Sequence, residues 1–207
     1  MKKLVKSGLI LVIILNFSYL HAQFNYSFNQ VVKSTFSTKK SPNQKQTHFF
    51  NSNDDSFYMQ VFKQGDSVLS RIYDLNKQKV HYLYLADKEN QKFKFLKSKV
   101  YHEHSPKVFE FSELGSKNPI EELFVTIRNP DTDKKASYNL KVRESKTDLF
   151  HVFKYSVLDD LGINPLWSGQ NFIVVEAIGE NADGTCQQYK LNSIQKVNLS
   201  LNIPSGK

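Results

Sequence analysis

Apolar side chains recur at every second position along most of this sequence. Near the start of the pattern, Phe24, Tyr26 and Phe28 alternate with asparagine and serine. A period of two with one polar face is typical of a β-strand that lies on a core and exposes its other side to water. The same alternation returns in segments 57–61, 80–84, 93–95, 123–127, 138–142 and 197–203.

Short polar segments separate these stretches, among them Gln64-Gly65-Asp66 and Asn76-Lys77, and segment 37–46 reads as a long hairpin loop. Short connections join neighbouring strands antiparallel, because a parallel crossover needs about a dozen or more residues. We therefore expect an all-β fold, with about ten or eleven strands in one antiparallel meander. The meander should form a curved sheet, a partial barrel or a sandwich.

Two segments interrupt the alternation and predict one or two short helical insertions. Segment 118–122 combines asparagine, proline and two glutamates, which is typical of a helix start, but strand-forming residues follow at once. In segment 156–167, Val157, Leu158 and Leu161 have helical spacing, and glycine, asparagine and proline end the stretch.

The first 22 residues have the layout of a cleavable secretory signal, with an early lysine cluster, an apolar run over 9–15 and Ala22 before a polar residue. They resemble the signals of exported Gram-negative bacterial proteins. We expect cleavage after Ala22, which leaves residues 23–207 as one β-rich domain, periplasmic or extracellular. The run is too short to span a membrane, and no comparable run follows it. Because the only cysteine is Cys186, we expect no lipid anchor and no intrachain disulfide.

The sequence is basic, with 28 lysines and arginines against 20 acidic residues. The lysines are spread among acidic residues, and no aromatic–basic motif indicates a nucleic-acid partner. If the charge has a partner, anionic lipid or polysaccharide fits an exported protein. The alternative is that the lysines only keep the outward strand faces soluble.

Few residues suggest chemistry. His102 and His104 have a spacing that suits a metal ion if a third ligand comes from elsewhere, although their polar segment also suits plain solvation. Glu176 and His151 interrupt apolar stretches, where a functional group and a paired structural residue are both possible. Asp159 and Asp160 are adjacent on the expected helix and cannot converge by themselves. The Cys186 setting indicates a turn that enters a strand rather than a nucleophile.

Sequence motifs that are typical of enzymes are absent: the sequence has no phosphate loop, nucleophile elbow or helix-borne metal motif. We therefore assign no catalytic residue, metal or cofactor, and an enzyme is not favoured.

The aromatic content is high, with 16 phenylalanines and 10 tyrosines. Aromatic residues suit a β core, but a concave sheet could also hold an apolar ligand. We name Tyr82, Tyr84, Phe93 and Phe95 as the residues that would bind such a ligand. In outline, an exported aromatic-rich meander with helical insertions is similar to the half-open barrels of periplasmic lipoprotein carriers. The similarity is architectural and transfers no residue.

These observations leave more than one function open. The first hypothesis is an exported soluble binding protein that holds a lipid or other apolar ligand in a concave sheet. The alternative is an envelope-associated structural or protein-interaction module that presents an aromatic surface to another envelope component. A hydrolase or a metal-binding protein is less favoured.

Overall fold

The computed structural model describes residues 23–87, 89, 92–101, 107–114, 121–146, 149–158 and 171–204. The expected signal segment 1–22 lies outside these residues, as does most of the expected helix start at 118–122. The strands are β1 (Gln23–Thr38), β2 (Gln44–Asn51), β3 (Asp54–Gln64), β4 (Ser67–Asp74), β5 (Lys79–Asp87), β6 (Lys92–Val100), β7 (Val108–Glu113), β8 (Glu122–Arg128), β9 (Lys135–Glu144), β10 (Phe172–Glu180) and β11 (Cys186–Pro204).

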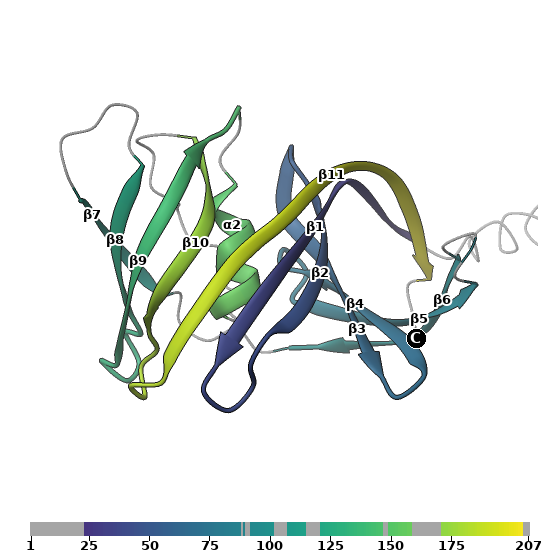
Figure 1. The fold of residues 1–207 in the computed structure, drawn as a ribbon. Coiled ribbons are helices and arrows are strands. Elements are labelled where there is room, and N and C mark those ends of the chain that lie inside the picture. Colours follow the sequence, from purple (N-terminus) through teal and green to yellow (C-terminus); the bar gives the residue numbers. More distant parts are fainter. Residues whose placement is uncertain are drawn as a thin grey trace, which may run out of the picture.

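All of these strands belong to one antiparallel sheet with the order β6-β5-β4-β3-β2-β1-β11-β10-β9-β8-β7. The all-β antiparallel prediction is confirmed. The first and last strands lie together in the middle of the sheet, where β1 and β11 form a long pair that crosses the molecule (Figure 1). One meander, β2 to β6, extends from β1, and the other, β10 to β7, extends from β11.

The alternation of the sequence is visible in the burial of each strand. In β8, for example, Leu123, Val125 and Ile127 are buried, and the residues between them are half-buried. The hairpins follow the predicted turns, and Gly65 and Gly184 adopt positive φ angles that glycine tolerates best. The predicted loop at 37–46 is shorter than expected, because β1 continues to Thr38 and β2 begins at Gln44.

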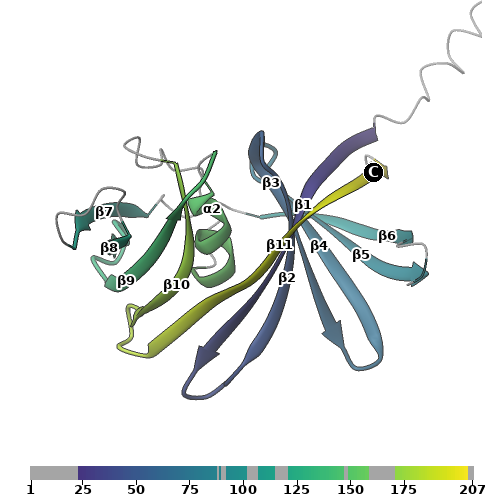
Figure 2. The same ribbon diagram turned by 45° about the horizontal axis from the view of Figure 1, so that its top comes forward.

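The helical insertion begins earlier than predicted. Helix α2 (Phe150–Phe153) runs directly into the π-helical segment η1 (Lys154–Leu158), so only its last three residues fall in the expected segment 156–167. Residues 159–167 lie outside the described part. No side chain caps the helix start at Leu149, and the whole helix is buried between the two halves of the sheet (Figures 1 and 2). Packing rather than local sequence signals therefore stabilises this helix.

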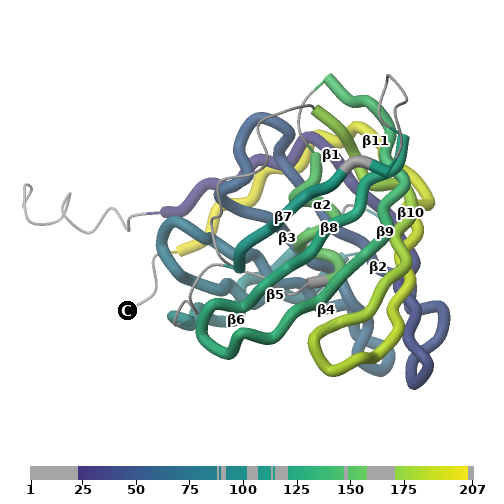
Figure 3. The backbone as a smooth tube through the Cα atoms, turned by 90° about the vertical axis from the view of Figure 1, so that its left-hand side faces the viewer, coloured from purple at the N-terminus to yellow at the C-terminus, as the bar shows by residue number. Residues whose placement is uncertain are grey.

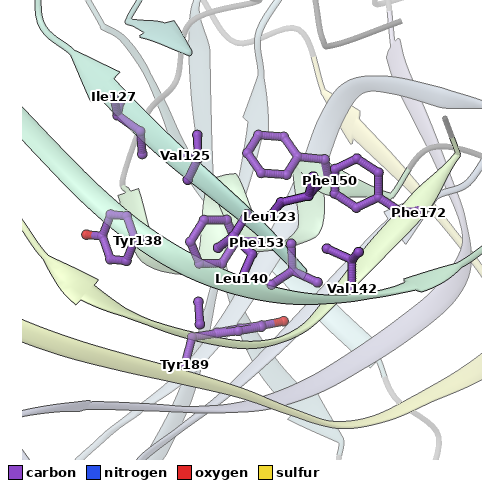
Figure 4. Close-up of a cluster of buried hydrophobic side chains, with 12 residues drawn as sticks. Leu123, Val125, Ile127, Tyr138, Leu140, Val142, Phe150, Phe153, Phe172 and Tyr189 are labelled. Atoms are coloured by element: carbon purple, nitrogen blue, oxygen red, sulfur yellow. The ribbon is translucent and has the colours of Figure 1, made fainter. Parts of the chain in front are cut away.

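Two clusters of buried side chains surround α2 and η1. On one side, Phe150 and Phe153 pack against apolar residues of β8, β9, β10 and β11 (Figure 4). On the other side, Val152 and Tyr155 pack against β1 to β5, where Tyr58 stacks on Tyr155 with ring centroids 4.2 Å apart. Figure 3, viewed from the β7 edge, shows β7, β8 and β9 as a wall in front of α2.

A third cluster lies on the opposite side of β3, β4 and β5. The first part of β1 and the last part of β11 bend over this side, and they contribute Tyr26, Phe28 and Ile203 to it. This bend follows a register shift between Phe28 and Gln30, and such irregularities sharpen strand twist. As a result β11 comes near β6, although β6 stays an edge strand of the sheet (Figure 2). We call this third cluster the inner core.

Candidate functional site

The four predicted ligand-binding residues lie on two faces of the sheet. Strand register pairs Leu83 with Phe95, and it pairs Tyr84 with Lys94. Because paired residues share a face, Phe93 and Phe95 point to the inner core, whereas Tyr82 and Tyr84 point to the other side. The structure therefore does not bring the four together, and their ligand-binding role stays a prediction.

Phe93 and Phe95 are half-buried and pack against the inner core. Two cavities of the molecule lie elsewhere. One, of about 340 Å³, adjoins the β8–β9 and β10–β11 turns and is lined by Lys134, Tyr138 and Asp183 among others. The other, of about 390 Å³, lies over β8, β9 and β10. None of the four predicted residues lines either cavity.

Tyr82 and Tyr84 belong to a continuous surface on β3 to β6. Strand register aligns two rows of side chains across these four strands. We call these two rows the aromatic–basic face; they are Gln60-Arg71-Tyr82-Lys97 and Phe62-Leu69-Tyr84-Lys94. The lysines are exposed and the other six side chains are half-buried, so the face is in contact with solvent.

Two basic side chains of this face lie beside aromatic rings rather than acidic side chains. The Arg71 Cζ atom lies 4.6 Å from the ring centroid of Phe62 and 5.7 Å from that of Tyr82. The Lys97 Nζ atom lies 5.6 Å from the Tyr82 centroid. Neither row contains an acidic residue, and the buried Nε of Arg71 has no hydrogen-bond partner in the described part of the chain. The face therefore carries uncompensated positive charge beside apolar rings.

A second polar feature is a chain of hydrogen bonds that links β1, β4, β5 and β6. The Tyr26 hydroxyl donates to Asp74 Oδ2 at 2.6 Å and lies 2.8 Å from His81 Nε2. On the other side of the ring, His81 Nδ1 lies 2.7 Å from Ser98 Oγ. Lys77 completes the chain with its Nζ 2.9 Å from Asp74 Oδ2.

The direction of this chain follows from its donors. Tyr26 has one hydroxyl proton and gives it to Asp74, so its oxygen accepts the proton of His81 Nε2. His81 Nδ1 is then the acceptor for the Ser98 hydroxyl. Every hydrogen bond points toward the Asp74 carboxylate.

Burial and charge set the protonation states in this chain. Burial raises the pKa of the Asp74 carboxyl, but hydrogen bonds from Tyr26 and Lys77 outweigh it and hold the pKa below its usual range. Burial and the Asp74 hydrogen bond raise the pKa of Tyr26 well above its usual value. Burial lowers the pKa of His81 to about 4, although the Asp74 charge opposes this effect. At neutral pH the chain therefore holds a carboxylate, a phenol and a neutral imidazole.

The other sequence candidates do not converge on a site. Glu176 pairs with Lys141 at 3.2 Å and with Lys190 at 3.9 Å, which matches the paired alternative. His151 is buried within α2, and Cys186 is exposed at the start of β11. Among the described residues, no group of three or more His, Cys, Asp or Glu could hold a metal ion. His102, His104, Asp159 and Asp160 lie outside the described part.

Sequence reasoning missed both polar features. Alternation of lysine and phenylalanine in 92–97 was visible, but Arg71 joins those lysines only through strand register. Tyr26 and His81 are 55 positions apart, so no local pattern connects them.

No described helix is long and apolar enough to cross a membrane. The chain matches neither a protein-family model nor any curated protein sequence.

Proposed function

We propose that this chain is an exported envelope protein that binds anionic lipid surfaces peripherally through the aromatic–basic face. The observation that carries the proposal is the pair of cross-strand rows, which present Arg71, Lys94 and Lys97 with no acidic residue between them. Export itself rests on the pattern of residues 1–22.

Lipid surfaces suit both properties of this face. Each basic side chain near an anionic bilayer contributes about 1 kcal/mol, so three contribute about 3 kcal/mol. Tyrosine rings favour the boundary between lipid headgroups and acyl chains, since they have an apolar body and a polar hydroxyl. Tyr82 lies between Arg71 and Lys97, and Tyr84 lies beside Lys94, so both rings adjoin cations as such binding requires.

The aromatic–basic face supports lipid binding better than the inner core does. On the inner side of the same strands, Phe93, Phe95 and Leu83 pack into the inner core with residues of β1 and β11. An apolar ligand there would have to displace side chains that already contact one another. A lipid surface meets the aromatic–basic face without such a change.

Vesicle binding tests this proposal. The full chain, exported and processed by a bacterial host, is mixed with phosphatidylglycerol vesicles and, separately, with phosphatidylcholine vesicles, and bound protein is measured by cosedimentation. We expect binding to the anionic vesicles only, weakening as salt rises because ions screen exposed charges. Equal binding to both vesicle types would contradict the proposal.

Charge-reversal variants locate the contact. Lys94→Glu with Lys97→Glu should weaken binding at least tenfold, since about 1 kcal/mol per basic residue is lost and new repulsion is added. The matched control is Lys45→Glu with Lys135→Glu, which makes the same charge change at exposed positions of β2 and β9. An equal loss in the control would show that net charge alone matters, and would rule out a defined face.

A further inference from the structure

We propose that Ser98 is an activated nucleophile that accepts an acyl group from a carboxylic ester, with His81 as its general base. The proposal stands on the hydrogen-bonded chain that includes Tyr26, Asp74, His81 and Ser98. It is independent of lipid binding by the aromatic–basic face, which lies on the other side of the strands. It gives the chain a hydrolytic activity in addition to the proposed binding function.

Geometry matches what a serine nucleophile requires. The hydroxyl of Ser98 lies 2.7 Å from His81 Nδ1, within reach for proton transfer. His81 is oriented by Tyr26 at 2.8 Å, and Tyr26 is in turn held by Asp74 at 2.6 Å. The Tyr26 hydroxyl thus connects the Asp74 carboxylate to the His81 imidazole through two hydrogen bonds. Tyr26 is therefore a positioning residue.

Burial differs between Ser98 and the three residues that lie behind it in the hydrogen-bonded chain. Tyr26, Asp74 and His81 are 3%, 3% and 0% exposed, whereas Ser98 is only half-buried on the edge strand β6. Here the carboxylate and the base are buried, and the hydroxyl that would react is more exposed than either of them.

Side chains near Ser98 could stabilise the negative charge that develops on the substrate oxygen during acyl transfer. Lys79 precedes His81 by two positions on β5 and pairs with Val100, so it occupies the residue pair next to Ser98 on the same side. A cation there would stabilise a developing oxyanion. The Phe24 ring lies 5.4 Å from that of His81, and Lys77 and Lys79 lie 4.5 and 5.2 Å from Phe24. A small acyl group beside Ser98 would therefore meet the side of His81 that carries the Phe24 ring and the Lys79 cation.

The reaction balances without a cofactor. Ser98 Oγ forms a bond to the acyl carbon while its proton passes to His81 Nδ1, and the bond to the leaving alcohol breaks as that oxygen takes the proton. Water then attacks the acyl-serine and gives a proton to Nδ1, and the proton returns to Oγ as the carboxylic acid leaves. Ester and water are consumed, and alcohol and acid are formed.

The experiment measures hydrolysis of p-nitrophenyl acetate by the full exported chain, and it locates the acetyl group by mass spectrometry after an acid quench. We expect acetyl on Ser98. Ser98→Ala should lower the rate at least 100-fold, since general-base activation of a hydroxyl contributes about 10²–10⁴-fold. Ser200→Ala, an exposed serine of β11, should leave the rate unchanged. Acetyl spread over several serines or lysines, or no acetyl on Ser98, would overturn the proposal.

Tyr26→Phe and the pH profile separate positioning from a structural role. The phenylalanine keeps the ring in the core but removes the link to Asp74, so the rate should fall about tenfold while circular dichroism stays unchanged. The groups that face His81 are Tyr26, Asp74, Lys77, Lys79 and Ser98. Because burial lowers the pKa of His81 to about 4, the wild-type rate should stay level from pH 8 down to about pH 5. A rate that declines below pH 7 would contradict His81 as the base, and a rate that Tyr26→Phe does not change would contradict Tyr26 as its positioning residue.

Discussion

The Tyr26 hydroxyl stabilises the fold because it is the buried partner of both Asp74 and His81. Tyr26→Phe leaves two buried polar groups with one partner fewer, which costs about 1–3 kcal/mol of the free energy of unfolding. The measurement is urea denaturation followed by circular dichroism. Tyr84→Phe is the matched control, because its half-buried ring lies on the aromatic–basic face and a change below about 0.5 kcal/mol is expected. Equal effects of the two changes would show that the hydrogen bonds of Tyr26 add no stability to the fold.

Two buried histidines make stability depend on pH. Burial lowers the pKa of both His48 and His81 to about 4, below the value of about 6.5 in an unfolded chain. Between these values the unfolded chain binds more protons, so stability is complete above about pH 6.5 and falls as the pH approaches 4. By pH 4.5 each histidine should lower the free energy of unfolding by about 2–3 kcal/mol. The pKa of Asp74 is lowered, so its contribution is lost only below about pH 4 and lies outside this window.

Replacement of one histidine tests this assignment. His48 is completely buried among Phe50 and Tyr58 and has no charge beside it that shifts its pKa. His48→Gln should therefore remove about half of the stability change between pH 6.5 and 4.5, as measured by urea denaturation at each pH. An unchanged dependence on pH would mean that other groups are responsible.

At the level of the elements, the strands and the presence of a short helical insertion could be predicted, but the position of α2 could not. Period two is a local property, so Phe24 to Phe28, Phe57 to Val61 and Leu123 to Ile127 indicated strands that the structure contains. Helix α2 lacks a capping residue and spans only Phe150 to Phe153. It forms because the two halves of the sheet enclose it, which is a tertiary effect that residues 150–153 do not encode.

Removal of one helix side chain should therefore destabilise the whole sheet. Phe153 is fully buried, with ring centroids 5.7 Å from Tyr138 and 5.5 Å from Tyr189. Phe153→Ala leaves a cavity and should cost about 3–5 kcal/mol, whereas Phe153→Leu refills most of the space and should cost less than about 1.5 kcal/mol. Urea denaturation measures both variants. Similar small costs for both would show that the helix is not part of the core.

At the scale of the whole molecule, the features that local patterns could not reveal are the long-range ones. β1 pairs with β11 from the other end of the chain, and this pairing sets which strands become edges. The face of each aromatic residue also depends on register, so Tyr84 and Phe95 separate although both sit in alternating strands. The aromatic–basic face and the Ser98–His81–Tyr26–Asp74 chain arise from these pairings, because their members come from distant strands.

Closure of the inner core by β11 leads to the last prediction. Leu199, Leu201 and Ile203 face this core opposite the first residues of β1, and the alternate residues of β11 face solvent. Ile203 is buried, and Leu199 and Leu201 are half-buried. Replacing all three by serine should remove about 1.5–3 kcal/mol at Ile203 and a smaller amount at each leucine, a total that is a large part of the stability of an ordinary domain. The exported protein should then lose its cooperative unfolding transition in circular dichroism.

The alternate positions of the same strand provide the control. Asn198, Ser200 and Asn202 are exposed, so changing the three together to alanine keeps the strand and its pairing with β1. We expect the midpoint of this triple variant to stay close to that of the wild type, because surface changes usually alter stability by less than about 0.5 kcal/mol each. If both triple variants unfold alike, backbone pairing alone holds β11 in place. If only the serine variant fails, burial of one face of β11 is what joins the two meanders into a single sheet.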